Sequence, residues 1–267
     1  MFSDPDGVGE RLNRCLLCGS CAANCPSGVS ILEIFIRARS ILADYKGLPL
    51  AKKLLFKKML ASPKVFDTLS ELASGIQDLA LKDEENPQGT SCARFSSPLL
   101  RGRHVLPMAK TPFHKAVKNL RSDSGSGPRV LFFTGCLIDK ILPQIAHASV
   151  RVLRHHGARV IIPDGQGCCG IPALASGDMK TFSDLAAHHA GLFEKHGFDY
   201  LVTACATCTS TIKKLWPVLA SDNRPETGKA TDFGAIAEKT MDISEFLVDI
   251  LEIEPAAGRD TRSENSI

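Results

Sequence analysis

The chain has 267 residues, of which 44% are hydrophobic, and its formal net charge is +3. This length and apolar content are enough for a sizeable buried core in about two domains. The weak positive charge gives no indication of nucleic-acid binding. No apolar run approaches the roughly eighteen residues of a membrane span, and the N-terminus MFSDPDGVGERLN lacks the features of a signal peptide. We therefore expect a soluble protein of the cytoplasm.

Four closely spaced cysteines lie near the N-terminus, followed directly by a proline: Cys15, Cys18, Cys21 and Cys25. The spacing C-x2-C-x2-C-x3-C-P is typical of bacterial ferredoxins, whose loop wraps thiolates around a 4Fe-4S cluster. Zinc is the alternative metal. Zinc ribbons, however, separate two C-x2-C pairs by about a dozen residues or more, and no second pair follows here. We predict a ferredoxin-type 4Fe-4S cluster on these four cysteines.

The fourth ligand of this cluster stays open at the level of sequence. In two-cluster ferredoxins the last cysteine of each run ligates the other cluster, whereas this chain has a single run. Either Cys25 or the remote Cys92 completes the set. A lone cysteine in a polar stretch, such as Cys92, is more often unligated.

The other five cysteines lie in the second half of the chain: Cys136, Cys168, Cys169, Cys205 and Cys208. They fall near or after three β-rich apolar runs, at residues 129–134, 158–162 and 200–203. Helical patterns are expected at residues 137–155, 178–196 and 207–219.

Alternating strands and helices of these lengths predict βαβ units and a parallel sheet. The loops after parallel strands share the carboxyl edge of the sheet, so these five cysteines are expected to converge there. Each group also precedes a helix, whose N-terminal amides favour the thiolate form. The glycines at 135, 167 and 170 suit tight strand-to-helix turns. From the residues alone, an iron-sulfur cluster, zinc or an unmetallated redox thiol remain alternatives for this site.

The motifs resemble those of the cysteine-rich CCG-domain iron-sulfur proteins. That family includes the iron-sulfur subunits of glycolate and lactate dehydrogenases and the heterodisulfide reductase subunits. The resemblance lies in Thr134-Gly-Cys136, in Gln166-Gly-Cys-Cys-Gly-Ile-Pro172 and in Thr203-Ala-Cys-Ala-Thr-Cys208. The segment from Arg14 to Val29 resembles the second ferredoxin run of the glycolate oxidase iron-sulfur subunit. Family members typically have two ferredoxin runs and two cysteine-rich repeats, so this chain resembles a truncated or reduced member.

The resemblance implies a second, non-cubane 4Fe-4S cluster, or zinc, at the five-cysteine site. It also implies an electron-transfer subunit whose partner is an FAD-dependent dehydrogenase of 2-hydroxy acids such as glycolate or lactate. Two alternatives are heterodisulfide-reductase-like disulfide reduction and a structural zinc module in an inactive fragment. No catalytic residue outside the cysteines is predicted, and no nucleic-acid partner. Association with the inner face of the membrane is expected only through a complex.

The expected fold class is α+β overall: a mostly helical ferredoxin-type domain followed by an α/β parallel-sheet cysteine-rich domain. The expected boundaries are 1–60 for the cluster domain, 61–127 for a helical and loop linker region, 128–255 for the cysteine-rich domain and 256–267 for a disordered tail. Within these, residues 51–61 form a basic amphipathic helix, 82–98 a loop and 121–128 a linker. The histidine pairs at 155–156 and 188–189 are expected to have surface or packing roles.

Overall fold

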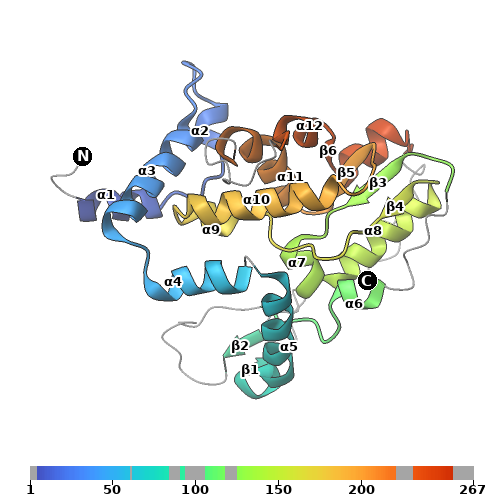
Figure 1. Cartoon of the computed structure of the whole chain (residues 1–267), viewed down its shortest axis with the longest axis horizontal. Helices are drawn as coiled ribbons and strands as arrows, with labels where there is room; N and C mark the ends of the chain where they lie inside the picture. Colours follow the sequence, from blue (N-terminus) through green and yellow to red (C-terminus); the bar gives the residue numbers. More distant parts are fainter. Residues whose placement is uncertain are drawn as a thin grey trace, which may run out of the picture.

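The computed structural model describes residues 5–60, 62–83, 91–93, 106–117, 125–220 and 231–254. The fold is mixed, with many helices and a four-stranded parallel sheet of order β4-β3-β5-β6 (Figure 1). The strands are β3 (Arg129–Phe132), β4 (Arg159–Ile161), β5 (Tyr200–Thr203) and β6 (Thr240–Asp242). The first three coincide with the predicted apolar runs. The fourth, with the sequence Thr-Met-Asp, was not predicted, because only one of its three residues is apolar and it forms no apolar run.

The strand order places a topological switch point at the centre of the sheet. From β3 the chain crosses to β4 on one side, and from β4 it crosses back over to β5 on the other side of β3. β3 and β5 are neighbours, and the chain leaves them in opposite directions, toward β4 and toward β6. In open α/β sheets this is the place where ligands bind.

Helices cover both faces of the sheet, and each face has its own apolar core. One core joins Leu131 and Leu201 to α10, η3 and α12, and the other joins Val130, Phe132 and Val202 to α6, α8 and η5. The helices of this part are α6 (Phe113–Ala116), α7 (Gly135–Lys140), α8 (Pro143–His155), α9 (Ile171–Ala175), α10 (Met179–Phe193), α11 (Ala206–Ser210), η3 (Thr211–Ala220), α12 (Phe233–Glu238), α13 (Ile243–Glu245) and η5 (Phe246–Ile250).

A helical segment precedes the sheet in the chain and packs against it (Figure 1). Its helices are α1 (Pro5–Asn13), α2 (Ser20–Ala23), α3 (Ile31–Lys46), α4 (Leu50–Leu54), η1 (Leu55–Leu60) and α5 (Pro63–Ala80). Helix α3 lies directly on the α9–α10 turn: a Cβ on Gly177 would lie 2.4 Å from the carbonyl oxygen of Arg39. Ile36 of α3 is buried in the core that contains Leu131. The cysteine loop ahead of α3 is thereby held beside the sheet.

Several sequence-based boundaries differ from the structure. The single helix expected at 137–155 is divided into α7 and α8, because Pro143 starts a new helix. The expected helix at 207–219 becomes α11 followed by the π-helix η3, which contains Pro217.

The loop expected at 82–98 was wrong in part, because β1 (Leu81–Asp83) and β2 (Ser91–Ala93) pair antiparallel there. Of the expected linker, residues 125–128 form an irregular segment up to the start of β3 and 121–124 lie outside the described residues, as does the chain after Glu254. Among the helices described, none is both long and apolar enough to cross a membrane.

Candidate metal centres

The five cysteines of the second half converge at the carboxyl edge of the sheet. Cys136 is the second residue of α7, which begins shortly after β3. Cys168 and Cys169 precede Gly170, the N-cap of α9, while Cys205 is the N-cap of α11 and Cys208 lies within it. The convergence expected from parallel strands is therefore present, and the cysteines that follow β3 and β5 flank the switch point.

The five thiols form a continuous row of interacting neighbours. The order in space is Cys136, Cys168, Cys169, Cys208 and Cys205. The three central residues are buried, whereas the two at the ends of the row are partly exposed. The row therefore runs through a water-poor region and reaches solvent at both ends.

The thiols in this row alternate in acidity. The neighbouring Cys136 and Cys169 raise the pKa of Cys168, whereas Cys168 lowers the pKa values of Cys136 and Cys169. Cys208 stands in the same relation to Cys169 and Cys205: the pKa of Cys208 is raised, and that of Cys205 is lowered to about 6. The pKa values of Cys136, Cys169 and Cys205 are thus lowered, and a lowered pKa suits a metal site because the thiolate is the form that binds metal.

The number of thiols bears on the metal that this site could hold. Five thiols converge here, whereas a tetrahedral zinc ion needs only four ligands. An extended row of five sulfurs instead offers ligands of one chemical kind to several metal ions, which is the donor set of iron-sulfur clusters.

Two glycines shape the backbone around this row. Gly135 has φ +64°, and a Cβ on it would lie 3.0 Å from the Sγ of Cys208. Gly170 has φ +98°, and its Cβ would lie 2.8 Å from the ring of Phe182. Both positions therefore need glycine for conformation and for space, as the sequence predicted. Gly167 has neither a positive φ nor a crowded Cβ, so the prediction was wrong for that glycine.

Side chains outside the cysteines hold the loops in place, and among them is His189, for which the sequence predicted a surface or packing role. His189 is buried; its Nε2 accepts from the Gly167 amide at 2.9 Å, and its Nδ1 donates to the Leu185 carbonyl at 2.7 Å. Burial lowers the pKa of His189 to about 4, so the ring is neutral. The signal for this role was its place on the apolar face of α10, between buried residues three and four positions away.

Gln166 and Trp216 have similar holding roles. Gln166 lies in the loop after β4, and its side chain binds the end of the neighbouring β3. It accepts from the Thr134 amide at 2.9 Å and donates to the Phe132 carbonyl at 3.0 Å. The buried Trp216 ring donates from Nε1 to the Cys169 carbonyl at 3.1 Å. Gln166 lies within the quoted cysteine motif, whereas nothing local in the sequence indicates the contact of Trp216.

The four N-terminal cysteines are carried by an exposed loop around the short helix α2. Cys18 and Cys21 are exposed, and Cys15 and Cys25 are partly exposed. The backbone turns sharply at Leu17, with φ +54°, and its amide donates to the Cys15 sulfur at 3.4 Å. A hydrogen bond with the Ser20 hydroxyl lowers the pKa of Cys18. The loop thus presents its sulfurs to solvent instead of to an apolar core.

The structure bears on the choice between Cys25 and Cys92 as the fourth member of this group. Cys92 lies in β2, beside α5, whereas the cysteine loop adjoins α2 and α3 at the other end of the helical segment (Figure 1). Cys25 follows α2 within the loop itself. The arrangement therefore favours Cys25.

A cavity of about 390 Å³ is lined by Cys18 of the N-terminal group and by residues adjacent to the cysteines of the sheet edge. Leu17 and Cys18 line one side of it, and Ile171, Ala206 and Thr207, which adjoin the cysteines of the sheet edge, line the other. Leu17 also packs against the core that contains Cys169 and Cys208. The groups that are more than a hundred residues apart in sequence are thus neighbours in the fold.

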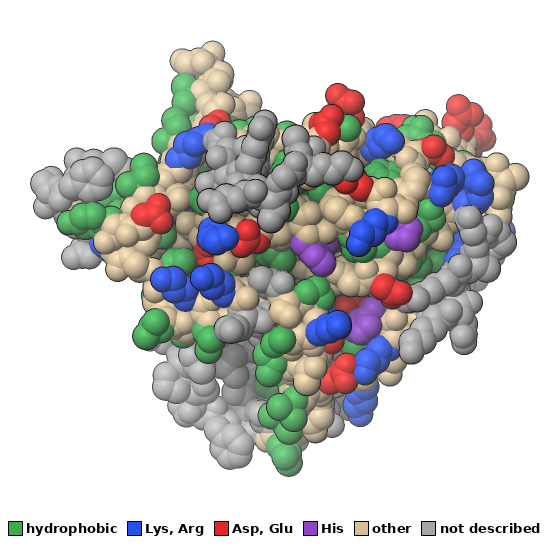
Figure 2. Space-filling view, in the orientation of Figure 1, with side chains coloured by type: hydrophobic (Ala, Val, Ile, Leu, Met, Phe, Trp, Pro, Cys, Tyr) green, Lys and Arg blue, Asp and Glu red, His purple; other side chains and the backbone are tan. Residues whose placement is uncertain are grey.

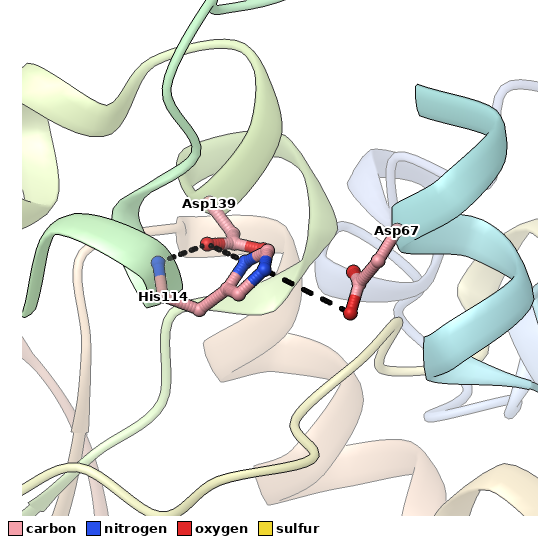
Figure 3. A group of neighbouring side chains, drawn as sticks. All are labelled: Asp67, His114 and Asp139. Carbon is pink, nitrogen blue, oxygen red and sulfur yellow. Dashed lines mark hydrogen bonds and ion pairs between the residues drawn. The ribbon is translucent and has the colours of Figure 1, made fainter. Parts of the chain in front are cut away.

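A third polar group, Asp67, His114 and Asp139, lies beside this region (Figure 3). The His114 Nδ1 lies 2.9 Å from a carboxylate oxygen of Asp139, and its Nε2 lies 3.8 Å from Asp67. The buried ammonium of Lys140 contacts both carboxylates. Burial alone would raise the pKa of Asp139, but His114 and Lys140 hold it below its ordinary value. Because Lys140 already supplies the cation, this group joins α5 to α6 and α7 and needs no metal.

Comparison with known proteins agrees with the pattern of cysteines. Residues 130–213 match the family described as cysteine-rich domain, CCG. Over 92% of its length the chain is 29% identical to a subunit of the fumarate reductase (CoM/CoB) of Methanothermobacter marburgensis and covers 38% of that protein. Over 94% of its length it is 28% identical to the probable glycolate oxidase iron-sulfur subunit of Bacillus subtilis and covers 56% of it.

A shorter match is more similar in sequence. The chain is 33% identical, over 47% of its length, to lactate utilization protein A of an Exiguobacterium species and covers 50% of that protein. It thus spans less than two thirds of the length of these relatives. No solved structure matches. Residues 130–213 thus match the CCG cysteine-rich domain, and the chain is similar to iron-sulfur subunits of oxidoreductases.

Proposed function

We propose that the chain is an iron-sulfur electron-transfer subunit of an oxidoreductase, with two metal centres. The first is a ferredoxin-type 4Fe-4S cluster, and the second is a further iron-sulfur cluster at the sheet edge. The proposed ligands are Cys15, Cys18, Cys21 and Cys25 for the first, and Cys136, Cys168, Cys169, Cys205 and Cys208 for the second. The observation that carries this proposal is the packing of Leu17, which lies between Cys15 and Cys18, against the core that contains Cys169 and Cys208, since electrons move between centres only when these lie close together.

The protein supplies different surroundings for the two centres. A 4Fe-4S cluster accepts or donates one electron at a time, at a potential set by hydrogen bonds, charge and burial. The exposed thiols of Cys18 and Cys21 place the first centre where a partner subunit can reach it. The buried thiols of Cys168 and Cys169 exclude water from the second. Leu17 and Ile171 line the space between them.

The finer part of the proposal concerns the partner and its substrate. We place an FAD-dependent dehydrogenase of glycolate or lactate upstream, with the complex in the cytoplasm or at the inner face of the membrane. The support is the similarity to proteins named for glycolate oxidase and lactate utilization. The exposed first loop is the surface at which such a partner would deliver electrons.

The deciding experiment is metal analysis with EPR on protein purified without oxygen. About four irons and four sulfides are expected for the first centre, and additional iron with a second EPR signal for the other. Stoichiometric zinc with little iron would overturn the proposal in favour of a structural zinc module.

Two single substitutions make this experiment specific. Cys18→Ser should abolish the cubane EPR signal and the reduction of an artificial dye by the complex with its flavin subunit. Cys92→Ser is the matched control, because Cys92 lies in β2 outside both groups, and it should leave both readings unchanged. Unchanged electron transfer in Cys18→Ser would contradict the assignment.

A second candidate function is reduction of a disulfide at the sheet-edge cysteines. It is favoured by Cys205, a partly exposed end of the sulfur row whose neighbours Ala206 and Thr207 line the cavity. Such a reaction takes up two electrons and two protons and yields two thiols. A small aliphatic disulfide added to the reduced protein should then change the EPR signal of the second centre and be consumed. No change with any disulfide tested would exclude this function.

A further inference from the structure

Helix α5 presents an apolar stripe to solvent. The stripe consists of five large side chains that are 41% to 76% exposed: Val65, Leu69, Leu72, Ile76 and Leu79. In Figure 2 hydrophobic side chains follow one another along the lower edge of the molecule, over α5. A globular chain rarely leaves a contiguous apolar surface of this kind uncovered.

The opposite face of α5 is the one that packs on the rest of the chain, and it is largely polar. Phe66, Ser70 and Ser74 are buried there. The Gln77 side chain accepts from the Met108 amide at 2.7 Å and donates to the Met108 carbonyl at 2.9 Å. These contacts fix the rotation of the helix about its axis. The apolar stripe therefore faces outward as a consequence of specific contacts on the inner face.

The spacing within the stripe is that of a coiled-coil seam. The five residues follow one another at intervals of four, three, four and three, which is the alternation of the a and d positions of heptads. A stripe with this repeat packs side by side with a second helix, by insertion of side chains into the spaces between those of the neighbour. Because α5 is already folded against its own chain, pairing does not have to order it.

We propose that α5 pairs with α5 of a second copy of this chain, antiparallel, with the two-fold axis at Leu72. Leu72 is the central residue of the stripe, so that its side chain meets its own counterpart in the second copy. Val65 then packs near Leu79 of the second copy, and Leu69 near Ile76. An antiparallel pair of identical stripes is self-complementary, as a two-fold interface must be.

Charge and side-chain size favour this occupant and this direction. Lys64 lies in the first turn of α5, and Lys57 lies in η1 just before it. Antiparallel pairing brings them toward the C-terminal end of the other α5, whose helix dipole is negative, whereas parallel pairing would bring the two basic ends together. Gly75 lies close to the axis, and a Cβ on it would meet nothing within 4 Å. An exposed glycine weakens a helix, but here it lets the second backbone approach.

The first test is sedimentation velocity on the full chain, purified without oxygen with its metal, over a range of concentrations. The wild type should sediment as a dimer that dissociates on dilution. Leu72→Glu should raise the dissociation constant about 100-fold or more, because two charges would be buried at the axis. Val248→Glu is the matched control, since Val248 is 60% exposed on η5, against 63% for Leu72, and lies outside the stripe.

The second test remains informative if Leu72→Glu fails to fold. A photo-crosslinking amino acid at position 72 should join two chains through the same helix, and one at position 248 should not. A monomeric wild type, a dimer unaffected by Leu72→Glu, or a cross-link within one chain would overturn the proposal. Metal content and EPR signals should be the same in Leu72→Glu and wild type, which separates this result from the proposed function.

Discussion

The two cysteine groups are built on opposite principles. The sheet-edge group is held by strand ends, with buried thiols and with helices on both sides. The N-terminal group is held by turns, with two exposed thiols and with Leu16, directly after Cys15, at 90% exposure. The sheet-edge cysteines are positioned by the core of the protein. The N-terminal cysteines have no such support, so we expect a bound metal to order their loop, as in small metal-binding domains.

This difference should affect the stability of the protein. The largest expected effect is seen by truncating one leucine beside each cysteine group. Leu174, in α9 shortly after Cys168 and Cys169, is fully buried, whereas Leu16 is exposed. Leu174→Ala should lower the free energy of unfolding by about 2 to 5 kcal/mol, because it opens a cavity in the core. Leu16→Ala should change it by less than about 0.5 kcal/mol. Chemical denaturation of the metal-loaded protein, followed by circular dichroism, measures both. Equal effects would show that the loop has a core of its own.

The sequence-based prediction was most successful where strand and helix patterns were long. Val130, Leu131 and Phe132 lie in a continuous apolar run, and such a run identifies a strand buried on both faces. Once three such strands are placed in parallel, the convergence of Cys136, Cys169 and Cys205 follows from geometry. The order of the sulfurs in the row does not follow, because it depends on side-chain contacts between different loops.

One glycine near each cysteine group allows the backbone surroundings of the two groups to be compared. Gly170→Ala should cost about 3 kcal/mol, since it adds left-handed strain of about 1 to 2 kcal/mol to a clash with Phe182. Gly28, after the N-terminal cysteines, has φ +63° but no atom within 4 Å of a Cβ. Gly28→Ala should therefore cost only the strain, about 1 kcal/mol. Denaturation midpoints at constant m-value measure the pair, and equal losses would refute the role of Phe182.

Contacts between distant segments were beyond the reach of sequence patterns. The outward-facing stripe of α5 illustrates this, because its 4-3 repeat would ordinarily be assigned to the core. The structure places Ser70 and Ser74 inward instead. Likewise, the split of the helix expected at 137–155 was missed although Pro143 is a local signal for it, whereas the pairing of β1 with β2 within an expected loop has no local signal.

The buried histidine gives the sheet-edge group a pH dependence. His189 has a pKa of about 4 in the fold, against about 6.5 in the unfolded chain. Below pH 6.5 the unfolded chain therefore takes up a proton that the folded chain does not. The free energy of unfolding should fall by about 2 kcal/mol between roughly pH 6.5 and pH 5 from this group.

The substitution His189→Gln should remove this slope, because glutamine keeps an acceptor for the Gly167 amide without titrating. His188→Gln, on the exposed side of the same helix, serves as the control and should keep the slope of the wild type. Denaturation at a series of pH values gives the comparison. Identical slopes in wild type and His189→Gln would show that the ring titrates freely.

The smallest effect concerns the link between the two groups. Arg39 of α3 is buried and donates to the carbonyl oxygens of Leu12 and Cys15 on one side and of Ala175, at 2.8 Å, on the other. Lysine has one nitrogen and cannot reach all three acceptors in this planar arrangement. Arg39→Lys should therefore cost about 1 to 2 kcal/mol.

The same substitution should speed hydrogen exchange in the N-terminal cysteine loop while leaving β3 and β5 protected, because only the loop depends on this anchor. Arg37→Lys is the matched control on α3. Arg37 forms a surface ion pair with Glu33 at 2.9 Å, and the substitution should lower the free energy of unfolding by less than about 0.5 kcal/mol. If exchange in the loop were unchanged in Arg39→Lys, the loop would have to be held by its metal alone. The two centres would then be neighbours without being mechanically coupled.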